Sequence, residues 1–459
     1  MYSRDEVKAI TDKIFNMAQG HDVEVDLTGS ERSGTRWANS TITTNLIQYD
    51  RSLTLTVRVG EKVASATTRD FSDNGLKEAV AEAITTAKGN PDSPNLPALL
   101  GAQTYIPVDA TLSSGVNFGP RERAMMVKAS SDICEKRGVL GSGYIPKTHQ
   151  TNCTANTKGL FAYYAFAETG FVLTCRMPDG SGSGWAGTTG IKDPAMIDPV
   201  ALTDVAAGKA LRSRNARALE PGRYTVILEP RANARFLSLL TGIFNQGGGP
   251  GGPGGPGGPG GPGGGGGFPG GGGGGLAFMR DKKPGDKILS DLVTLRSDVG
   301  NPILRQTTML ANNTPAAPAT WVEKGVLRNL AGGPDGPKAT TNMSLVMDGS
   351  DLSVDDMVKQ TKRGLLVTFF WYIRGVDNAT LLNTGMTRDG LFLIENGEIT
   401  RPVQNFRWNM SPLVGYNNVS LVGKPVPMHM GESYDGGGTA FIPPARLEDF
   451  YMTSISPAV

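Results

Sequence analysis

The sequence predicts an α+β fold, in which small N-terminal α/β segments precede a β-rich C-terminal domain with few helices. Two observations support this prediction. Before about residue 220, segments with apolar residues at helical spacing alternate with segments of strand-like alternation. After about residue 275, the pattern becomes mainly that of strands and turns. We therefore divide the chain into a first segment (1–95), a middle segment (96–220) and a C-terminal domain (221–459).

The first segment is predicted to fold as a helix, a hairpin and a second helix. Ser3 and Glu6 have the spacing of a capping box at the start of the first helix. Two alternating strands flank Gly60-Glu61, which is typical of a hairpin turn. The Ala-rich stretch that follows is a second helix, capped near Ser72 and ended by Gly89.

The middle segment follows a Pro-bearing stretch that resembles a linker. Its first helix is predicted from Pro120 to about Arg137, because Pro favours the first turn and Gly138 follows the last. Short strands are expected near 150–157 and 162–175, and a further helix near 199–213.

The C-terminal domain begins with "PGRYTVILEP", a predicted strand that leads into a helix at Arg231–Asn245. A tract of Gly and Pro at 247–275 interrupts the domain, and we expect a solvent-exposed loop there. Asn396-Gly397 is the clearest hairpin turn, because both residues accept positive φ. One short helix is predicted between a Ser353 cap and Gly364.

Composition excludes several classes of protein. The 459 residues carry a net charge of +2 without a basic block, which argues against a nucleic-acid-binding surface. The N-terminus lacks an apolar signal region, and no run of about 18 apolar residues predicts a membrane helix. The three cysteines are expected to be reduced and partly buried: Cys134, Cys153 and Cys175. These features predict a cytoplasmic protein.

Recognisable catalytic motifs are scarce. None of the three histidines, His21, His149 and His429, has a second ligand at a known zinc spacing. His429 has Glu432 and Asp435 nearby, and these three residues are the remaining ligand candidates. The sequence contains no G-x-S-x-G elbow, no P-loop and no strand-linked G-x-G-x-x-G.

Several longer segments of the sequence nevertheless follow one another in an order that is characteristic of a known family. They include "RWANSTITTNLIQYDRSLTLTVRVGEKVASATTRD", "WVEKGVLRNL", "RGLLVTFFWYIRGV" and "TRDGLFLIENGEITRPV", with "PPARLEDFYMTSIS" at the end. From about Glu31 to Ser456, the chain resembles the TldD/PmbA (TldE) family, the so-called gyrase-modulator peptidases.

The resemblance implies a zinc site in catalytic members of the family. Their H-E-x-x-x-H motif lies on the helix after the first strand of the third segment, with two His ligands and a Glu general base. A later cysteine completes that site. Here Ser238 and Ile243 occupy the His positions, Leu239 occupies the Glu position, and no cysteine follows Cys175.

The chain therefore resembles the metal-free PmbA/TldE branch. That resemblance implies a non-catalytic subunit of a heteromeric zinc protease, with zinc in a TldD-like partner carrying H-E-x-x-x-H. The subunit would help form a chamber for unfolded peptides, and whether it is catalytic by itself stays open.

Three alternatives to this subunit role are considered. The chain could be a homo-oligomeric peptide-binding or scaffold protein without a catalytic partner. It could be an independent hydrolase with a displaced site at His429, Glu432 and Asp435. Direct action on gyrase or DNA is supported by neither charge nor motif.

Overall fold

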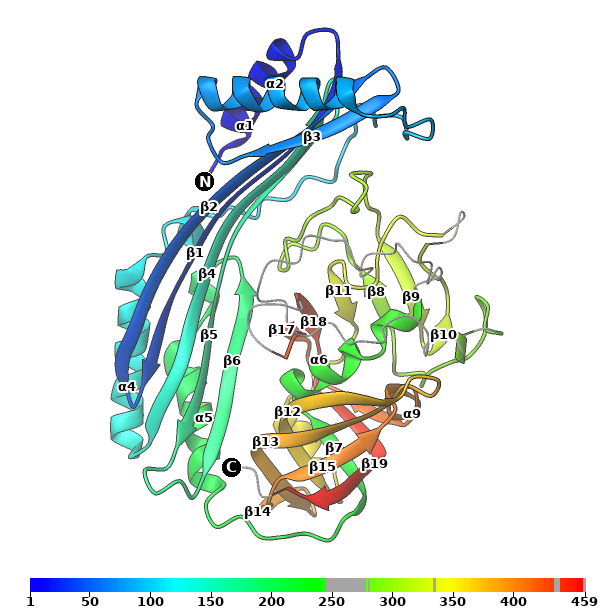
Figure 1. Ribbon diagram of the computed structural model, residues 1–459. Coiled ribbons are helices and arrows are strands. Elements are labelled where there is room, and N and C mark those ends of the chain that lie inside the picture. The colour runs from blue at the N-terminus through cyan, green and yellow to red at the C-terminus, as the bar shows by residue number, and fades with distance from the viewer. Residues whose placement is uncertain (245–277, 280, 333–335, 433–437, 457–459) are drawn as a thin grey trace.

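The computed structural model describes residues 1–244, 278–279, 281–332, 336–432 and 438–456. The Gly/Pro tract at 247–275 and Asp435 lie outside these residues. The described chain mixes helices with a larger share of strands and has few helices in its C-terminal half, which confirms the predicted α+β class (Figure 1). None of the helices in the described ranges is long and apolar enough to cross a membrane.

The N-terminal half is built on one six-stranded antiparallel sheet with the order β3-β2-β1-β4-β5-β6. Its strands are β1 (Asp22–Ala38), β2 (Thr41–Val59), β3 (Lys62–Thr68), β4 (Leu140–Asn156), β5 (Phe161–Arg176) and β6 (Ser183–Ile191). Helices cover its two ends (Figure 1). At one end are α1 (Arg4–Met17) and α2 (Asp73–Gly89), and along the other are α4 (Pro120–Arg137) and α5 (Pro199–Arg212), with the short α3 (Ser113–Val116) and η1 (Pro194–Met196) nearby.

This sheet joins the two predicted N-terminal segments. β1 of the first segment pairs with β4 of the middle segment from Glu24↔Asn156 to Trp37↔Gly143. The predicted boundary near residue 95 thus separates strands of the same sheet, and the division at 95 and 220 stays a prediction.

A closed ring of strands forms the lower part of the C-terminal half. The strands pair in the order β12-β7-β19-β15-β13, and β13 also pairs with β12. The ring strands are β7 (Gly222–Leu228), β12 (Arg363–Asp377), β13 (Leu382–Glu395), β15 (Phe406–Met410) and β19 (Ala445–Ile455), with β14 (Glu398–Pro402) and β16 (Val419–Val422) paired outside the ring and α8 (Val354–Lys359) against its wall. Closure leaves these five strands without a free edge.

A second sheet of six short strands lies above the ring in Figure 1, with the order β10-β9-β8-β11-β18-β17. Its strands are β8 (Leu295–Ser297), β9 (Ala319–Glu323), β10 (Val326–Leu327), β11 (Leu345–Met347), β17 (Val426–His429) and β18 (Thr439–Ile442). Helix α6 (Pro230–Ser238) lies between this sheet and the ring, followed by η2 (Thr241–Phe244), and α9 (Pro412–Asn417) packs beside it.

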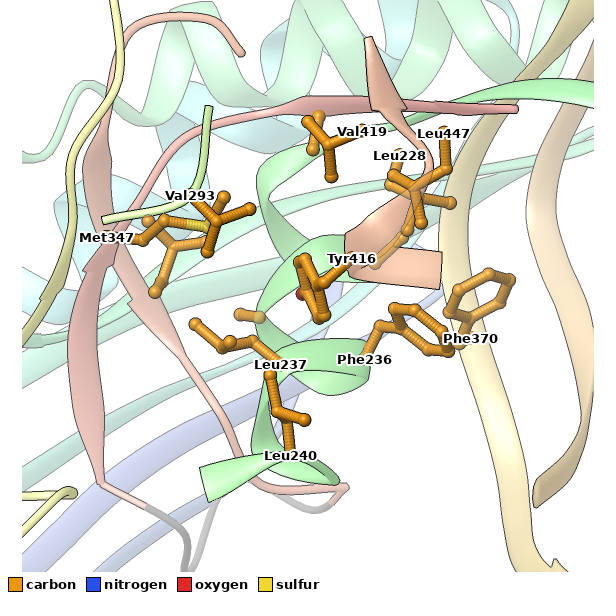
Figure 2. Packing of buried hydrophobic residues seen from close by; sticks show 14 of the residues in the cluster. Leu228, Phe236, Leu237, Leu240, Val293, Met347, Phe370, Tyr416, Val419 and Leu447 are labelled. Carbon is orange, nitrogen blue, oxygen red and sulfur yellow. The ribbon is translucent and has the colours of Figure 1, made fainter. Parts of the chain in front are cut away.

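Phe236 of α6 fills the centre of the ring. Its side chain is fully buried and contacts the rings of Tyr416, Phe450, Trp408 and Phe370, with centroids 5.4 to 6.3 Å apart. Figure 2 shows Phe236 and Phe370 beside Tyr416, with Leu237 and Leu240 on other sides of the helix. This large apolar core fixes the position of α6.

Most local predictions are confirmed. The capping box of Ser3 and Glu6 starts α1, and Ser72 caps α2. Helix α4 spans Pro120–Arg137, followed by Gly138 in the left-handed conformation. Asn396 and Gly397 both have positive φ in the β13–β14 turn.

Several predictions differ from the structure. Strand β1 is absent from the predicted elements of the first segment, and α8 ends at Lys359, so Gly364 lies within β12 and does not end the helix. The helix expected at Arg231–Asn245 ends at Ser238 and continues only as a 3₁₀ turn, because Thr241 and Gly242 are poor helix formers. Strand β6 was missed because its glycines disfavour a strand locally. A Cβ on Gly184 would lie 2.4 Å from the Ala206 carbonyl of α5, so close packing requires the glycine.

All three cysteines are buried free thiols, as predicted. Cys134 of α4 and Cys175 of β5 lie close together, with 3.8 Å between their Sγ atoms.

Candidate functional site

The positions at which the resemblance implies a zinc motif begin at Ser238, the last residue of α6, and continue through Leu239 to Ile243 in the 3₁₀ turn η2. The chain enters this helix from β7, where the Glu229 N–H donates to the Val367 carbonyl of β12. Pro230 starts the helix in the first turn, where no backbone donor is needed. The helix is therefore held by the ring at its N-terminus and by Phe236 at its centre.

The three mapped side chains are a hydroxyl and two alkyl groups. The Ser238 hydroxyl donates to the Arg235 carbonyl at 2.7 Å and lies 3.3 Å from Arg235 Nη1, which donates to it. Leu239 is half-buried against the core, and Ile243 is buried within it. Neither alkyl group can bind zinc, and the hydroxyl is already hydrogen-bonded.

Two arginines missed by the sequence analysis lie one helical turn apart on α6. Arg231 Nη1 donates to the His429 carbonyl at 2.5 Å, and its Nη2 donates to the Gly431 carbonyl at 2.7 Å. Arg235 Nη1 donates to the Met430 carbonyl at 2.8 Å. Both residues are almost completely buried, and they fasten α6 to the segment that follows β17. Their i,i+4 spacing was visible in the sequence, but their carbonyl partners were not.

These arginines make the site unsuitable for zinc. Burial lowers the pKa of the Arg235 guanidinium, an effect that the nearby Glu432 carboxylate opposes. A guanidinium nevertheless stays protonated in proteins. Two fixed positive charges beside a site without imidazole or thiolate ligands do not fit a divalent metal ion.

The alternative ligand candidates lie at the end of β17. His429 is buried, and its backbone pairs with Thr439 of β18. Glu432 Oε1 accepts a hydrogen bond from the Tyr372 N–H at 2.8 Å, while Arg374 Nη1 donates to its Oε2 at 3.3 Å. Asp435 lies outside the described residues. Within those residues, no three His, Cys, Asp or Glu side chains gather as a metal-binding group.

A separate buried cluster joins the two halves of the chain. Lys209 of α5 forms a salt bridge with Glu229 at 2.6 Å and donates to the Trp185 carbonyl of β6. Asp389 of β13 is also buried, and that burial raises its pKa, although Arg388 opposes the effect. These contacts hold α6 and the ring against the N-terminal sheet.

Solved structures with this fold are available for comparison. A candidate modulator of DNA gyrase from Thermotoga maritima has a TM-score of 0.75 and 15% identity, covering 97% of this chain and 99% of that one. TldE from Thermococcus kodakarensis has a TM-score of 0.73 and 16% identity, covering 98% and 100%. A candidate gyrase modulator from Bacteroides thetaiotaomicron has a TM-score of 0.71 and 16% identity, covering 98% and 99%. At such low identities, these likenesses concern the fold.

Sequence models identify the family. The model of PmbA/TldA metallopeptidase domain 1 matches residues 23–87, and that of the C-terminal domain of the same family matches residues 274–454. A comparison with curated proteins gave no match. The fold and the two models define a metallopeptidase-like protein of two joined halves. The chain belongs to the PmbA/TldD family, which includes TldE, as its sequence predicted.

Proposed function

We propose that this chain is a non-catalytic, TldE/PmbA-like subunit of a heteromeric TldD/TldE-type zinc metalloprotease. It would help form the chamber in which unfolded peptides are cleaved. The chemistry of the segment from Ser238 to Ile243 is the observation that carries this proposal, because Ser238, Leu239 and Ile243 supply neither the ligands nor the general base of the family motif. In this proposal, zinc belongs to a TldD-like partner that keeps H-E-x-x-x-H.

An open strand edge supports a partner-binding role. β3 pairs with β2 only along 53–59, so 41–52 of β2 have β1 as their single neighbour among the described strands. This edge is about 40 Å long at the usual rise of a strand. Four large apolar side chains on it are exposed: Ile42, Leu46, Ile47 and Tyr49.

Such an edge is an aggregation hazard unless another chain covers it. A homologous catalytic subunit would present an equivalent edge. Two such edges can pair antiparallel about an approximate two-fold axis, which gives a closed dimer. We therefore assign this edge, residues 41–52, to the catalytic subunit.

Co-expression with a homologue that carries H-E-x-x-x-H tests the proposal. Native mass spectrometry should show a heteromer, and peptidase activity should require both chains and disappear with a chelator. Tyr49→Lys should weaken the complex, because lysine opposes edge pairing. Val205→Lys, at an exposed site on α5, is the matched control.

The outcomes separate the alternatives. If Tyr49→Lys and Val205→Lys weaken the heteromer equally, the edge at 41–52 is not part of the interface. A chain that stays apart from every such homologue would refute the subunit role.

The same edge also suits pairing between two copies of this chain. A stable homodimer that is lost in Tyr49→Lys, and that ignores the catalytic homologue, would favour the homo-oligomeric peptide-binding protein.

A further inference from the structure

Two hydrogen-bond donors and one further cation converge on the Glu432 carboxylate, and we call these three groups the carboxylate cradle: the Tyr372 N–H, the Arg374 guanidinium and the Arg235 guanidinium. The Tyr372 N–H donates to Oε1 at 2.8 Å, and Arg374 Nη1 donates to Oε2 at 3.3 Å. Arg235 Nη2 lies 3.9 Å from Oε2. The cradle thus combines groups from β12 and α6.

Each group is positioned by contacts other than Glu432. The β12–β13 register shifts between Trp371 and Arg374, and Tyr372 within this bulge has a φ of 52°. The bulge turns the Tyr372 N–H out of the strand ladder. The Arg374 guanidinium stacks on the Tyr372 ring at 4.1 Å. Arg235 is held by the Met430 carbonyl.

The cradle has more positive charge and more donors than Glu432 uses. Two guanidiniums face one carboxylate, and within the described chain Glu432 is the only carboxylate that forms a salt bridge with either of them. Arg235 is only 6% exposed, yet its Nε has no hydrogen-bond partner among the described residues. A buried donor without a partner is costly, so the present contacts do not fully satisfy the Arg235 guanidinium.

Glu432 can leave the cradle by rotation of its own side chain, because it borders solvent and 27% of that side chain is exposed. The Tyr372 ring beside it is also exposed. A ligand that replaced Glu432 would therefore find cationic donors for a carboxylate and an aromatic wall for the neighbouring side chain.

We propose that the cradle binds a carboxylate group of a bound peptide, and that Glu432 occupies the site until the peptide displaces it. This inference rests on the proposed peptide-binding function. Backbone N–H groups and arginines are general means of capturing a C-terminal carboxylate, and an acidic side chain offers the same chemistry. Glu432 therefore competes directly with the ligand.

Fluorescence anisotropy with the isolated full-length chain tests this inference without the partner subunit. The probes are three N-terminally fluorescein-labelled pentapeptides. The first is Gly-Ala-Gly-Ala-Leu with a free C-terminus, and the second is its C-terminal amide. The third is the amide of Gly-Ala-Gly-Ala-Asp, which carries its carboxylate on a side chain.

Half-buried Glu432 and exposed Arg374 provide the variants. Glu432→Gln keeps the shape of the occupant but removes its charge, and should tighten binding of the free acid about tenfold. Arg374→Gln should weaken it by a similar factor, about tenfold, through loss of one charge-assisted hydrogen bond. Arg407→Gln, on strand β15 of the same ring and also exposed, is the matched control and should bind like the wild type. Circular dichroism checks that each variant is folded.

The peptides distinguish the sources of the carboxylate. Preference for the free acid identifies a C-terminus as the ligand, whereas equal binding of the aspartate amide extends the site to acidic side chains. Equal affinity for the acid and both amides in Glu432→Gln overturns the inference, as does failure of that variant to bind any of them. Neither result bears on the subunit role, which is judged by complex formation.

Discussion

Replacing Phe236 by alanine should strongly destabilise the C-terminal half. Its fully buried ring contacts four other aromatic rings inside the closed ring of strands. Replacing a buried Phe by Ala typically lowers the free energy of unfolding by about 3–5 kcal/mol. Each aromatic pair contributes about 0.5–1.5 kcal/mol to stability, although these contributions are not strictly additive. We therefore expect a loss of about 4–5 kcal/mol in the free energy of unfolding.

Urea unfolding, monitored by tryptophan fluorescence, measures this loss, because the ring centroids of Trp408 and Phe236 are 6.0 Å apart. The matched control is Tyr451→Ala, an exposed aromatic residue on β19 of the same ring, for which about 1 kcal/mol or less is expected. Gly415→Ala gives an independent check. Its Cβ would lie 2.6 Å from the Phe236 ring and should cost about 1–3 kcal/mol by overpacking. A Phe236→Ala loss no larger than that of the control would refute the central role of this side chain.

Three further predictions concern charge and metal. Burial raises the folded-state pKa of Asp389, so the contribution of this residue to stability falls as pH rises from about 3.8. Asparagine also tolerates the positive φ at this position, and Asp389→Asn should raise the free energy of unfolding by about 1 kcal/mol at neutral pH. Equal stability of the variant and the wild type would contradict this. Burial and the Lys147 charge lower the pKa of His149 to about 4, so stability should fall as pH drops from 6.5 toward 4, and thermal unfolding of His149→Gln should lack that decline. The combined variant Ser238→His, Leu239→Glu and Ile243→His should bind less than one equivalent of zinc, as measured by metal analysis after dialysis. The reason is that the buried Arg231 and Arg235 remain beside the new ligands. One bound equivalent of zinc would show that these arginines do not exclude the ion.

Local features of the fold could be predicted because their causes lie within a few residues. The capping box of Ser3 and Glu6 and the turn at Asn396-Gly397 each depend on neighbours in the sequence. Strand β6 could not be predicted, because it depends on α5 packing against its glycines. The pairing of β12 with β13 closes the ring, and it could not be predicted because the alternation of apolar and polar residues along a strand does not specify its partner.

The candidate site was partly predictable. The family resemblance indicates the helix that ends at Ser238, and the spacing of His429 and Glu432 suggests a shared site; the role of these residues stays a prediction. What Glu432 contacts could not be predicted, since Arg374 lies 58 residues away in the sequence. Nothing local in either segment indicates that they meet.

The sheet shared by the two N-terminal segments has a consequence for the order of folding. β1 occupies the middle of that sheet, and its contact between Glu24 and Asn156 spans 132 residues of chain. Loop closure of this length is slow, so the hairpin of β1 and β2 must wait for β4 to be synthesised. During that interval the edge of β1 and residues 41–52 of β2 are open to other chains. Early association with a second subunit would then protect a nascent chain during its most aggregation-prone stage.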